Sequence, residues 1–216
     1  MLTEQDEAEL RIRRVIELWV LARDAADWPA FASVWHDDGW MTATWFQGPA
    51  ADFIAASQAG FEAGVSILHF LGGFRCEVAG QRAIAQTKMT IMQRAEVHGV
   101  TVDVACTGRF YDFLDCRDGR WGIVRRQPIY EKDRLDPVDP AARLTLDPQL
   151  LARFPTGYQH LAYVQAQLGF RIAPQLPGLR GPAVELLYRE GHDWQNGSPR
   201  PGRPTATGLV SPAADR

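Results

Sequence analysis

The sequence predicts an α+β fold in which helices come first and a run of long antiparallel strands follows. The first observation is a segment near the N-terminus whose apolar residues recur at helical spacing. The second is a set of three later segments with strand composition, joined by short turns. Helices that precede such a sheet pack against one of its faces. We therefore expect a curved antiparallel sheet wrapped around N-terminal helices, with a C-terminal helical arm.

The first predicted helix begins at a capping box formed by Thr3 and Asp6 and ends at Arg23-Asp24. Its buried stripe consists of Ile12, Val15, Ile16, Trp19 and Ala22. A short second helix is expected through Phe31, Val34 and Trp35. The next four residues, His36 to Gly39, are expected to form a solvated turn. His36 stands beside two aspartates, but no further ligands follow at metal-site spacing, so no metal site is predicted.

The remaining elements follow from composition and turn signals. We expect a strand over Trp40–Phe46, closed by Gln47-Gly48-Pro49, and a third helix over about Ala50–Ala63. Three further strands are predicted, and the turns His98-Gly99 and Arg117–Arg120 separate them. These strands are Ala83–Val97, Val100–Leu114 and Trp121–Tyr130.

A histidine inside an apolar run is the main chemical signal in the chain. His69 follows Ile67 and Leu68 and precedes Phe70 and Leu71. In an extended strand it shares a face with Ile67 and Leu71. If that face lines a cavity, His69 is a buried base that titrates near neutrality. The structural alternative is a core histidine that bonds a backbone carbonyl.

Composition narrows the class of protein. The chain has 216 residues, 46% of them apolar, and a net charge of −3, which fits one domain plus an appendage and gives no sign of a basic surface for nucleic acid. The N-terminus is acidic, and no apolar run approaches the ~20 residues of a membrane span. We expect a cytoplasmic protein that binds neither membrane nor nucleic acid. Cys76, Cys106 and Cys116 are predicted to be reduced thiols.

Proline marks the predicted division of the chain. Twelve of the 14 prolines lie from Pro128 onward. We expect a domain over residues 1–133, a helical arm over 134–195 and a disordered tail over 196–216. The arm is predicted to contain three helices that carry many aromatic residues, and so to dock on the domain or on another subunit. The predicted helices are Pro148–Phe154, Gly157–Leu168 and Pro182–Arg189.

The order of elements and three motifs together resemble the nuclear-transport-factor-2-like superfamily, in its SnoaL-like branch, and within it the scytalone dehydratases. The motifs are the helix end Arg23–Trp28, the strand His69–Gly73 and the turn Asp118–Trp121. The resemblance covers roughly Ile12 to Asp133. It implies a cone of curved sheet with an apolar pocket, used in several members for eliminations or isomerisations without a cofactor.

By this resemblance Asp24 and His69 match a catalytic dyad, and Trp19 matches a pocket wall. General-base catalysis by this pair can also be argued without the resemblance. A carboxylate that holds one ring N–H fixes the tautomer of a neutral imidazole and stabilises the imidazolium that forms. Asp24 also sits at the helix end that disfavours an acid. No nucleophile elbow, phosphate loop or His-Glu-x-x-His motif suggests another chemistry.

The chain also departs from the scytalone dehydratases. Arg23 and Ala43 stand where those enzymes place tyrosines, and their second histidine falls on Gln86 or Thr87. Dehydration in the melanin pathway is therefore not expected. The predicted pocket residues are Trp19, Arg23, Trp45, Thr87, Phe110, Arg125 and Tyr130, of which Arg23, Arg125 or Tyr130 would donate to a substrate oxygen. The arm from about Asp147 to Phe170 is predicted to close the pocket, with Phe154 and Tyr158 as lid residues.

We therefore expect a cofactor-free lyase, a dehydratase or another β-eliminating enzyme, acting on a hydrophobic aromatic or polycyclic small molecule. One alternative is an isomerase of the ketosteroid-isomerase type. Another is a non-catalytic structural subunit or binding module of the same fold. A homo-oligomer, dimer or trimer, is expected in each case.

Overall fold

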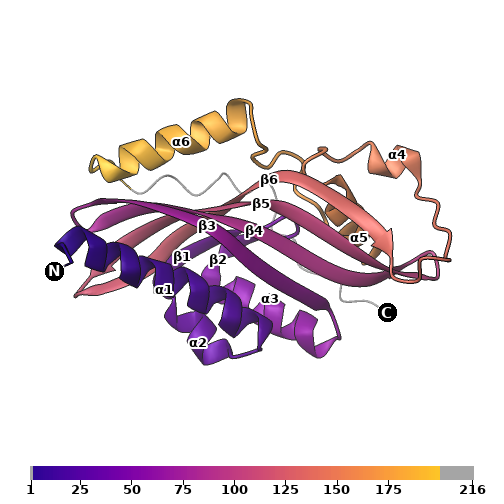
Figure 1. The fold of residues 1–216 in the computed structure, drawn as a ribbon, viewed down its shortest axis with the longest axis horizontal. Helices are drawn as coiled ribbons and strands as arrows, with labels where there is room; N and C mark the ends of the chain where they lie inside the picture. The colour runs from indigo at the N-terminus through magenta and orange to yellow at the C-terminus, as the bar shows by residue number, and fades with distance from the viewer. Residues whose placement is uncertain (1, 200–216) are drawn as a thin grey trace.

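The computed structural model describes residues 2–199. Six strands form one sheet, which is curved and open (Figure 1). The strand order is β2-β1-β6-β5-β4-β3. Neighbouring strands are antiparallel except β1 and β6, which run parallel, so the sheet is not antiparallel throughout. The strands are β1 Trp35–Thr42, β2 Gln47–Pro49, β3 Ser66–Ala79, β4 Arg82–Val97, β5 Val100–Arg117 and β6 Arg120–Pro137.

Helices cover both faces of this sheet (Figure 1). The N-terminal helices α1 (Glu4–Asp24), α2 (Trp28–Ser33) and α3 (Ala50–Glu62) lie against one face, which we call the inner face. The C-terminal helix α6 (Pro182–Gln195) lies across the opposite, outer face. The short helices α4 (Pro148–Leu151) and α5 (Gln159–Gln167) sit near one end of the long strands. The predicted α+β architecture with N-terminal helices is confirmed.

The N-terminus of α1 has the predicted capping box. The Thr3 backbone N–H donates to the Asp6 carboxylate at 2.8 Å, and the Asp6 N–H donates to the Thr3 hydroxyl at 3.2 Å. Two N–H groups that the helix itself leaves unpaired are thereby satisfied. At the other end Ala26 adopts a left-handed conformation with φ of 59°, which stops the helix directly after Asp24. The side chains of Trp19, Arg23 and Asp24 are thus fixed against the sheet.

The prediction of a solvated turn at His36–Gly39 was wrong. These residues belong to β1, and His36 is buried at 4% exposure. One ring nitrogen, Nε2, lies 2.9 Å from the Asp115 carbonyl oxygen, and Nδ1 accepts from Arg120 at 2.9 Å. Burial lowers the pKa of His36. His36 is a structural residue that links β1 to the β5–β6 turn, and no group of potential metal ligands occurs among residues 2–199.

The strand expected over Trp40–Phe46 is displaced, because β1 covers Trp35–Thr42 and Gln47–Pro49 forms the separate strand β2. Trp35, expected in the second helix, is the first residue of β1, and α2 ends at Ser33.

The three long predicted strands hold in position but not in length. Strand β6 continues through Asp133 to Pro137, past the expected end at Tyr130. In β3, His69 faces inward, whereas Leu68 and Phe70 are 53% and 68% exposed, as the alternation predicts. Helix α6 extends to Gln195, beyond the expected Arg189. Most of the predicted tail, residues 200–216, lies outside the described residues.

Two apolar cores result from this arrangement. The larger one fills the inner face and combines α1, α3, β1 and the long strands with Tyr158, Leu161 and Tyr163 of the arm. The smaller one lies between the outer face and α6, where Phe113 and Val124 meet Leu187 and Trp194. The arm therefore contributes to both cores and docks on the domain of its own chain. Placing the domain boundary at residue 133 stays a prediction.

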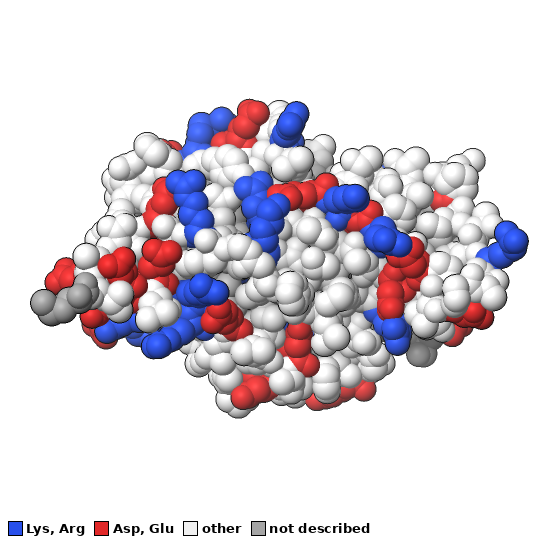
Figure 2. All heavy atoms as spheres, viewed as in Figure 1, with Lys and Arg blue, Asp and Glu red and all other residues white. Residues whose placement is uncertain are grey.

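The charged surface is mixed in sign. Figure 2 shows Lys and Arg side chains beside Asp and Glu over the sheet and α6. Ion pairs such as Lys88–Glu131 and Arg94–Asp103 account for part of this pattern. Among the described helices, none has the length and apolar character needed to cross a bilayer. The three cysteines are unpaired, as predicted.

Candidate active site

Asp24 and His69 lie in direct contact although they are far apart in the sequence. The Asp24 carboxylate makes two hydrogen bonds to one residue: Oδ1 lies 2.8 Å from His69 Nδ1, and Oδ2 accepts the His69 backbone N–H at 2.6 Å. The end of α1 supplies the carboxylate, and edge strand β3 supplies the histidine. This double contact fixes both the strand and the ring.

The contact also fixes the tautomer. A carboxylate can only accept, so Nδ1 carries the proton and Nε2 is left unprotonated as an acceptor. The His69 side chain is only 7% exposed. Burial lowers the pKa of His69, hydrogen bonding and charge attraction from Asp24 oppose this, and the charges of Arg23 and Arg126 lower it further. The ring is therefore neutral at pH 7 and able to accept a proton.

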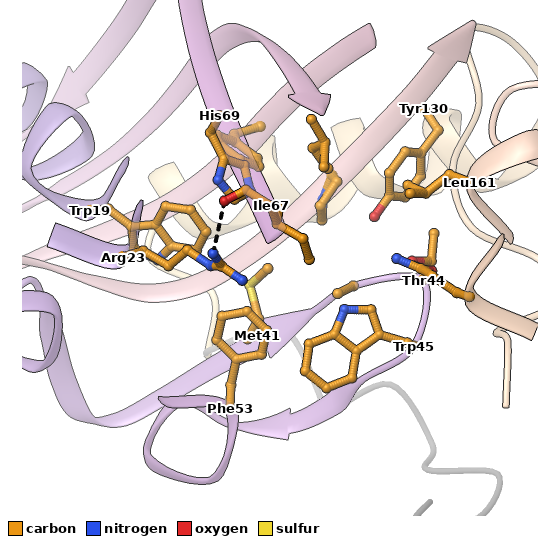
Figure 3. A pocket seen from close by; sticks show the side chains of 15 residues that line it. Trp19, Arg23, Met41, Thr44, Trp45, Phe53, Ile67, His69, Tyr130 and Leu161 are labelled. Carbon is orange, nitrogen blue, oxygen red and sulfur yellow. Dashed lines mark hydrogen bonds between the residues drawn. The ribbon is translucent and has the colours of Figure 1, made fainter. Parts of the chain in front are cut away.

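A cavity opens beside this imidazole on the inner face of the sheet (Figure 3). Its walls are mainly apolar and aromatic, and Trp19 meets His69 edge-on with ring centroids 5.3 Å apart. The polar groups that reach it include His69, Arg23, Thr44, Tyr130 and Gln165. The remaining lining residues are Met41, Ala43, Trp45, Phe53, Ile67, Ile91, Phe110, Pro128 and Leu161.

The cavity is narrow. Its volume is about 40 Å³. A single water needs roughly 10–15 Å³ on this measure. The closed structure thus has room for a few waters beside His69, and a bicyclic ligand requires the walls to move.

The C-terminal arm supplies part of the wall. Leu161 and Gln165 of α5 line the cavity, and Gln165 accepts a hydrogen bond from the Thr44 hydroxyl. Tyr158 is buried behind this wall, where its ring lies 5.0 Å from that of Tyr130 and its hydroxyl donates to the Ala173 carbonyl. Phe154 packs against the inner core. The predicted lid residues Phe154 and Tyr158 therefore support α5 without lining the cavity themselves.

Most of the predicted pocket residues do meet at the cavity. Trp19, Arg23, Trp45, Phe110 and Tyr130 all line it. The Tyr130 hydroxyl faces Thr44 in Figure 3, and burial raises the pKa of Tyr130 well above its ordinary value.

Two predicted pocket residues do not line the cavity. Arg125 lies on the outer face, where it pairs with Glu190 of α6 at 2.6 Å and sits over the Phe113 ring. Adjacent residues in a strand point to opposite faces of the sheet. Because Arg126 faces inward, Arg125 faces outward. Thr87 is buried at 3% exposure but is not among the lining residues.

A buried ion pair next to the site was missed from the sequence. Arg126 and Asp112 are both fully buried and bonded at 2.6 and 2.8 Å. The guanidinium lies over the rings of Trp19 and Phe110, at 4.4 and 4.0 Å. The sequence did indicate the direction of Asp112. It lies two residues after Phe110 in the same strand, so both side chains point to the inner face. This pair fixes two walls of the cavity and places a positive charge close enough to lower the pKa of His69.

A second histidine–aspartate pair has almost the same geometry but a different setting. Asp133 of β6 accepts the His160 backbone N–H at 2.6 Å and lies 2.8 Å from His160 Nδ1. It also accepts the Leu161 N–H at 2.9 Å, so it caps α5. His160 is not among the cavity-lining residues. A histidine held by an aspartate through its ring and its backbone N–H can therefore have a purely structural role. The Asp24–His69 pair differs from the Asp133–His160 pair because His69 lines the cavity.

Comparisons with known proteins agree with this architecture. The chain is 38% identical to pea pathogenicity protein 2 of Fusarium vanettenii over 189 residues, covering 85% of this chain and 80% of that protein. It is 34% identical to an uncharacterized protein of Emericella nidulans over 204 residues, covering 87% and 85%.

Solved structures share the fold at low sequence identity. One is LinA, with a TM-score of 0.53 and 14% identity, covering 66% of this chain and 97% of that one. Another is a candidate scytalone dehydratase from Novosphingobium aromaticivorans, with a TM-score of 0.52 and 15% identity, covering 67% and 100%. The model of the SnoaL-like domain matches residues 4–127. The chain therefore belongs to the SnoaL-like domain family of the nuclear-transport-factor-2-like superfamily.

Proposed function

We propose that this protein is a cofactor-independent lyase in which His69, oriented by Asp24, removes a proton from a carbon atom next to a carbonyl or phenol. Water or another β leaving group then departs from the substrate. The observation that carries the proposal is a buried, neutral imidazole with a fixed tautomer at the wall of an apolar cavity. Such a base contributes ~10²–10⁴-fold to proton abstraction.

The surroundings of the dyad suit this chemistry. Aromatic walls fit a hydrophobic, aromatic or polycyclic substrate, and a nearly closed site excludes water from the developing carbanion. Because the closed cavity is too small for two fused rings, α5 has to move outward to admit the substrate. The arm was predicted to cover the pocket of its own or a neighbouring subunit, and covering by the protein's own arm thus becomes part of the proposal.

The test uses two probes with a bicyclic skeleton. The first is 2-tetralone in D₂O, where proton NMR follows the exchange of its carbon-bound α-hydrogens. The second is 4-hydroxy-2-tetralone, which loses water to give 2-naphthol and so reports elimination. We expect wild-type protein to accelerate exchange, His69→Gln to lower the rate by ~10²–10⁴-fold, and Asp24→Asn to lower it with little change in binding.

His160→Gln is the matched control, because it removes an imidazole from the same kind of clamp outside the cavity. It is expected to retain the wild-type exchange rate. Equal exchange rates in wild-type, His69→Gln and Asp24→Asn proteins would end the enzymatic proposal and favour a non-catalytic subunit or binding module.

An isomerase of the ketosteroid-isomerase type is the second candidate, because the same base can return the proton to another carbon. The Tyr130 hydroxyl at the cavity favours it, since a buried phenol can donate to a developing enolate oxygen. Double-bond migration in 5-androstene-3,17-dione, without formation of 2-naphthol from the other probe, would select it. A cytoplasmic location and the absence of nucleic-acid partners remain part of the proposal.

A further inference from the structure

A second cavity adjoins the first and extends it toward α3. Its volume is about 20 Å³, and it shares Arg23, Trp45, Ile67 and Gln165 with the first. Ser57 of α3 and Phe170 of the arm also line it. The two cavities are therefore neighbours, with His69 lining the first and Arg23 lining both.

Arg23 is a buried cation whose hydrogen-bonding capacity is largely unused. It is 5% exposed, and its Nη1 donates to the Ile67 carbonyl at 3.2 Å, as the dashed line in Figure 3 marks. Its Nε is buried without a hydrogen-bond partner among the described residues. A buried donor without an acceptor is unfavourable, so a ligand that supplies an acceptor here gains binding affinity.

The nearest carboxylate does not satisfy Arg23. The distance from Arg23 Nη1 to Asp24 Oδ1 is 3.7 Å, longer than a hydrogen bond. Both Asp24 oxygens already accept from His69. Of the described residues that line the second cavity, Arg23 alone is charged, so its positive charge is only partly balanced there.

Ser57 provides an independent observation in the same cavity. It is 3% exposed, and its hydroxyl oxygen is buried without a partner among residues 2–199. The hydroxyl comes from α3, whereas Arg23 comes from α1. Two elements thus place unpartnered donors in one small cavity whose other walls include Trp45, Ile67 and Phe170.

We propose that the second cavity binds a carboxylate group of the substrate, through Arg23 with Ser57 as an additional donor. This inference rests on the proposed function and names the substrate class as hydrophobic carboxylic acids. The planar guanidinium offers parallel N–H donors that match a carboxylate better than a carbonyl or hydroxyl. The apolar body of the acid contacts Trp45 and Ile67, and its reacting carbon lies at His69 in the first cavity.

The test measures binding and does not depend on turnover. The probes are 2-naphthoate and its neutral analogue 2-naphthamide, titrated calorimetrically at pH 7.5 and low salt. We expect wild-type protein to bind the acid at least tenfold more tightly than the amide. Arg23→Gln is expected to abolish this preference, Arg23→Lys to retain part of it, and Ser57→Ala to reduce it about threefold.

Arg14→Gln is the matched control, since Arg14 is an exposed arginine on the same helix, and it is expected to keep the full preference. His69→Gln is also expected to keep it, which separates this inference from the catalytic one. Thermal unfolding of each variant shows whether it is folded, and Ser57→Ala leaves the Arg23–Ile67 bond in place. The inference is overturned if wild-type protein binds both probes equally or neither measurably, or if Arg23→Gln retains the preference.

Discussion

At the scale of single residues, Asp24 has two tasks that one carboxylate performs together. Its Oδ2 binds the backbone N–H of edge strand β3, and its Oδ1 holds the imidazole ring. Replacement by asparagine preserves shape and one acceptor but offers an N–H₂ group at the second position. The effect of Asp24→Asn on rate therefore reports on the ring contact, while its effect on stability reports on the strand contact.

Protonation of His69 is expected to destabilise the fold. The folded pKa is lowered by burial, whereas an unfolded histidine titrates near about 6.5. Between those two values the unfolded state binds more protons, so the free energy of unfolding falls as pH drops from about 6.5 toward the folded pKa. Urea denaturation at a series of pH values checks this. His69→Gln is expected to have a flatter dependence, and a slope identical to wild type would show that His69 does not contribute.

The buried Asp112–Arg126 pair is expected to be sensitive to loss of one partner. Asp112→Leu leaves a fully buried cation beside Trp19 and Phe110 without its carboxylate, which costs roughly 3–5 kcal/mol in unfolding free energy. Asp103→Leu is the control, because its pair with Arg94 is exposed and contributes at most about 1 kcal/mol. Similar losses for both variants in urea denaturation would mean that the buried pair has no special structural role.

At the scale of elements, α5 is the cavity wall that the proposed function requires to move, and Asp133 fixes its N-terminus. Asp133→Ala removes the acceptor for His160 and Leu161, which is expected to destabilise α5 by about 1 kcal/mol. Faster hydrogen exchange in Gln159–Gln167 than in wild type is the expected result. Asp147→Ala uncaps α4 in the same way and is expected to leave exchange in α5 unchanged.

The strands show which features of the fold could be predicted from the sequence and which could not. Strand β3 could be predicted with its facing, because His69 alternates with exposed Leu68 and Phe70. The buried setting of His36 could not, since two adjacent aspartates and a glycine are typical of a turn and only the distant Asp115 and Arg120 make a strand favourable. Arg125 was misplaced for a related reason. Its facing depends on the register of β6 against β5, which shifts near Phe113.

Some parts of the candidate site could be predicted from the sequence and others could not. The Asp24–His69 contact was predicted because it followed from a resemblance and a helix end. The inward direction of Asp112 could be predicted from Phe110, but its pairing with Arg126 depends on the register between β5 and β6, and the second cavity depends on helix–sheet packing. A single sequence contains neither. The arm could be predicted to dock, from its many aromatic residues. Which residues would line the cavity could not, and Leu161 and Gln165 take the place expected for Phe154 and Tyr158.

At the scale of the whole molecule, we expect a homo-oligomer, dimer or trimer. Leu68 and Phe70 stand exposed on the outer side of edge strand β3, and Met92 lies opposite Leu68 on β4 at 38% exposure. Contiguous exposed apolar groups of this kind are commonly covered by a partner. Sedimentation velocity is expected to show a dimer or trimer for wild type and a smaller species for Phe70→Ser. Monomeric wild-type protein would contradict the expectation.

The most direct test of the central claim is a nitrogen-15 NMR titration of the His69 side chain. A base at His69 requires a proton on Nδ1, a free Nε2 at pH 7, and a pKa below the ordinary value of about 6.5 for histidine. In Asp24→Asn protein the preference for this tautomer is expected to weaken. A wild-type ring that carries its proton on Nε2, or that is already charged at pH 7, would contradict the assignment of His69 as the base.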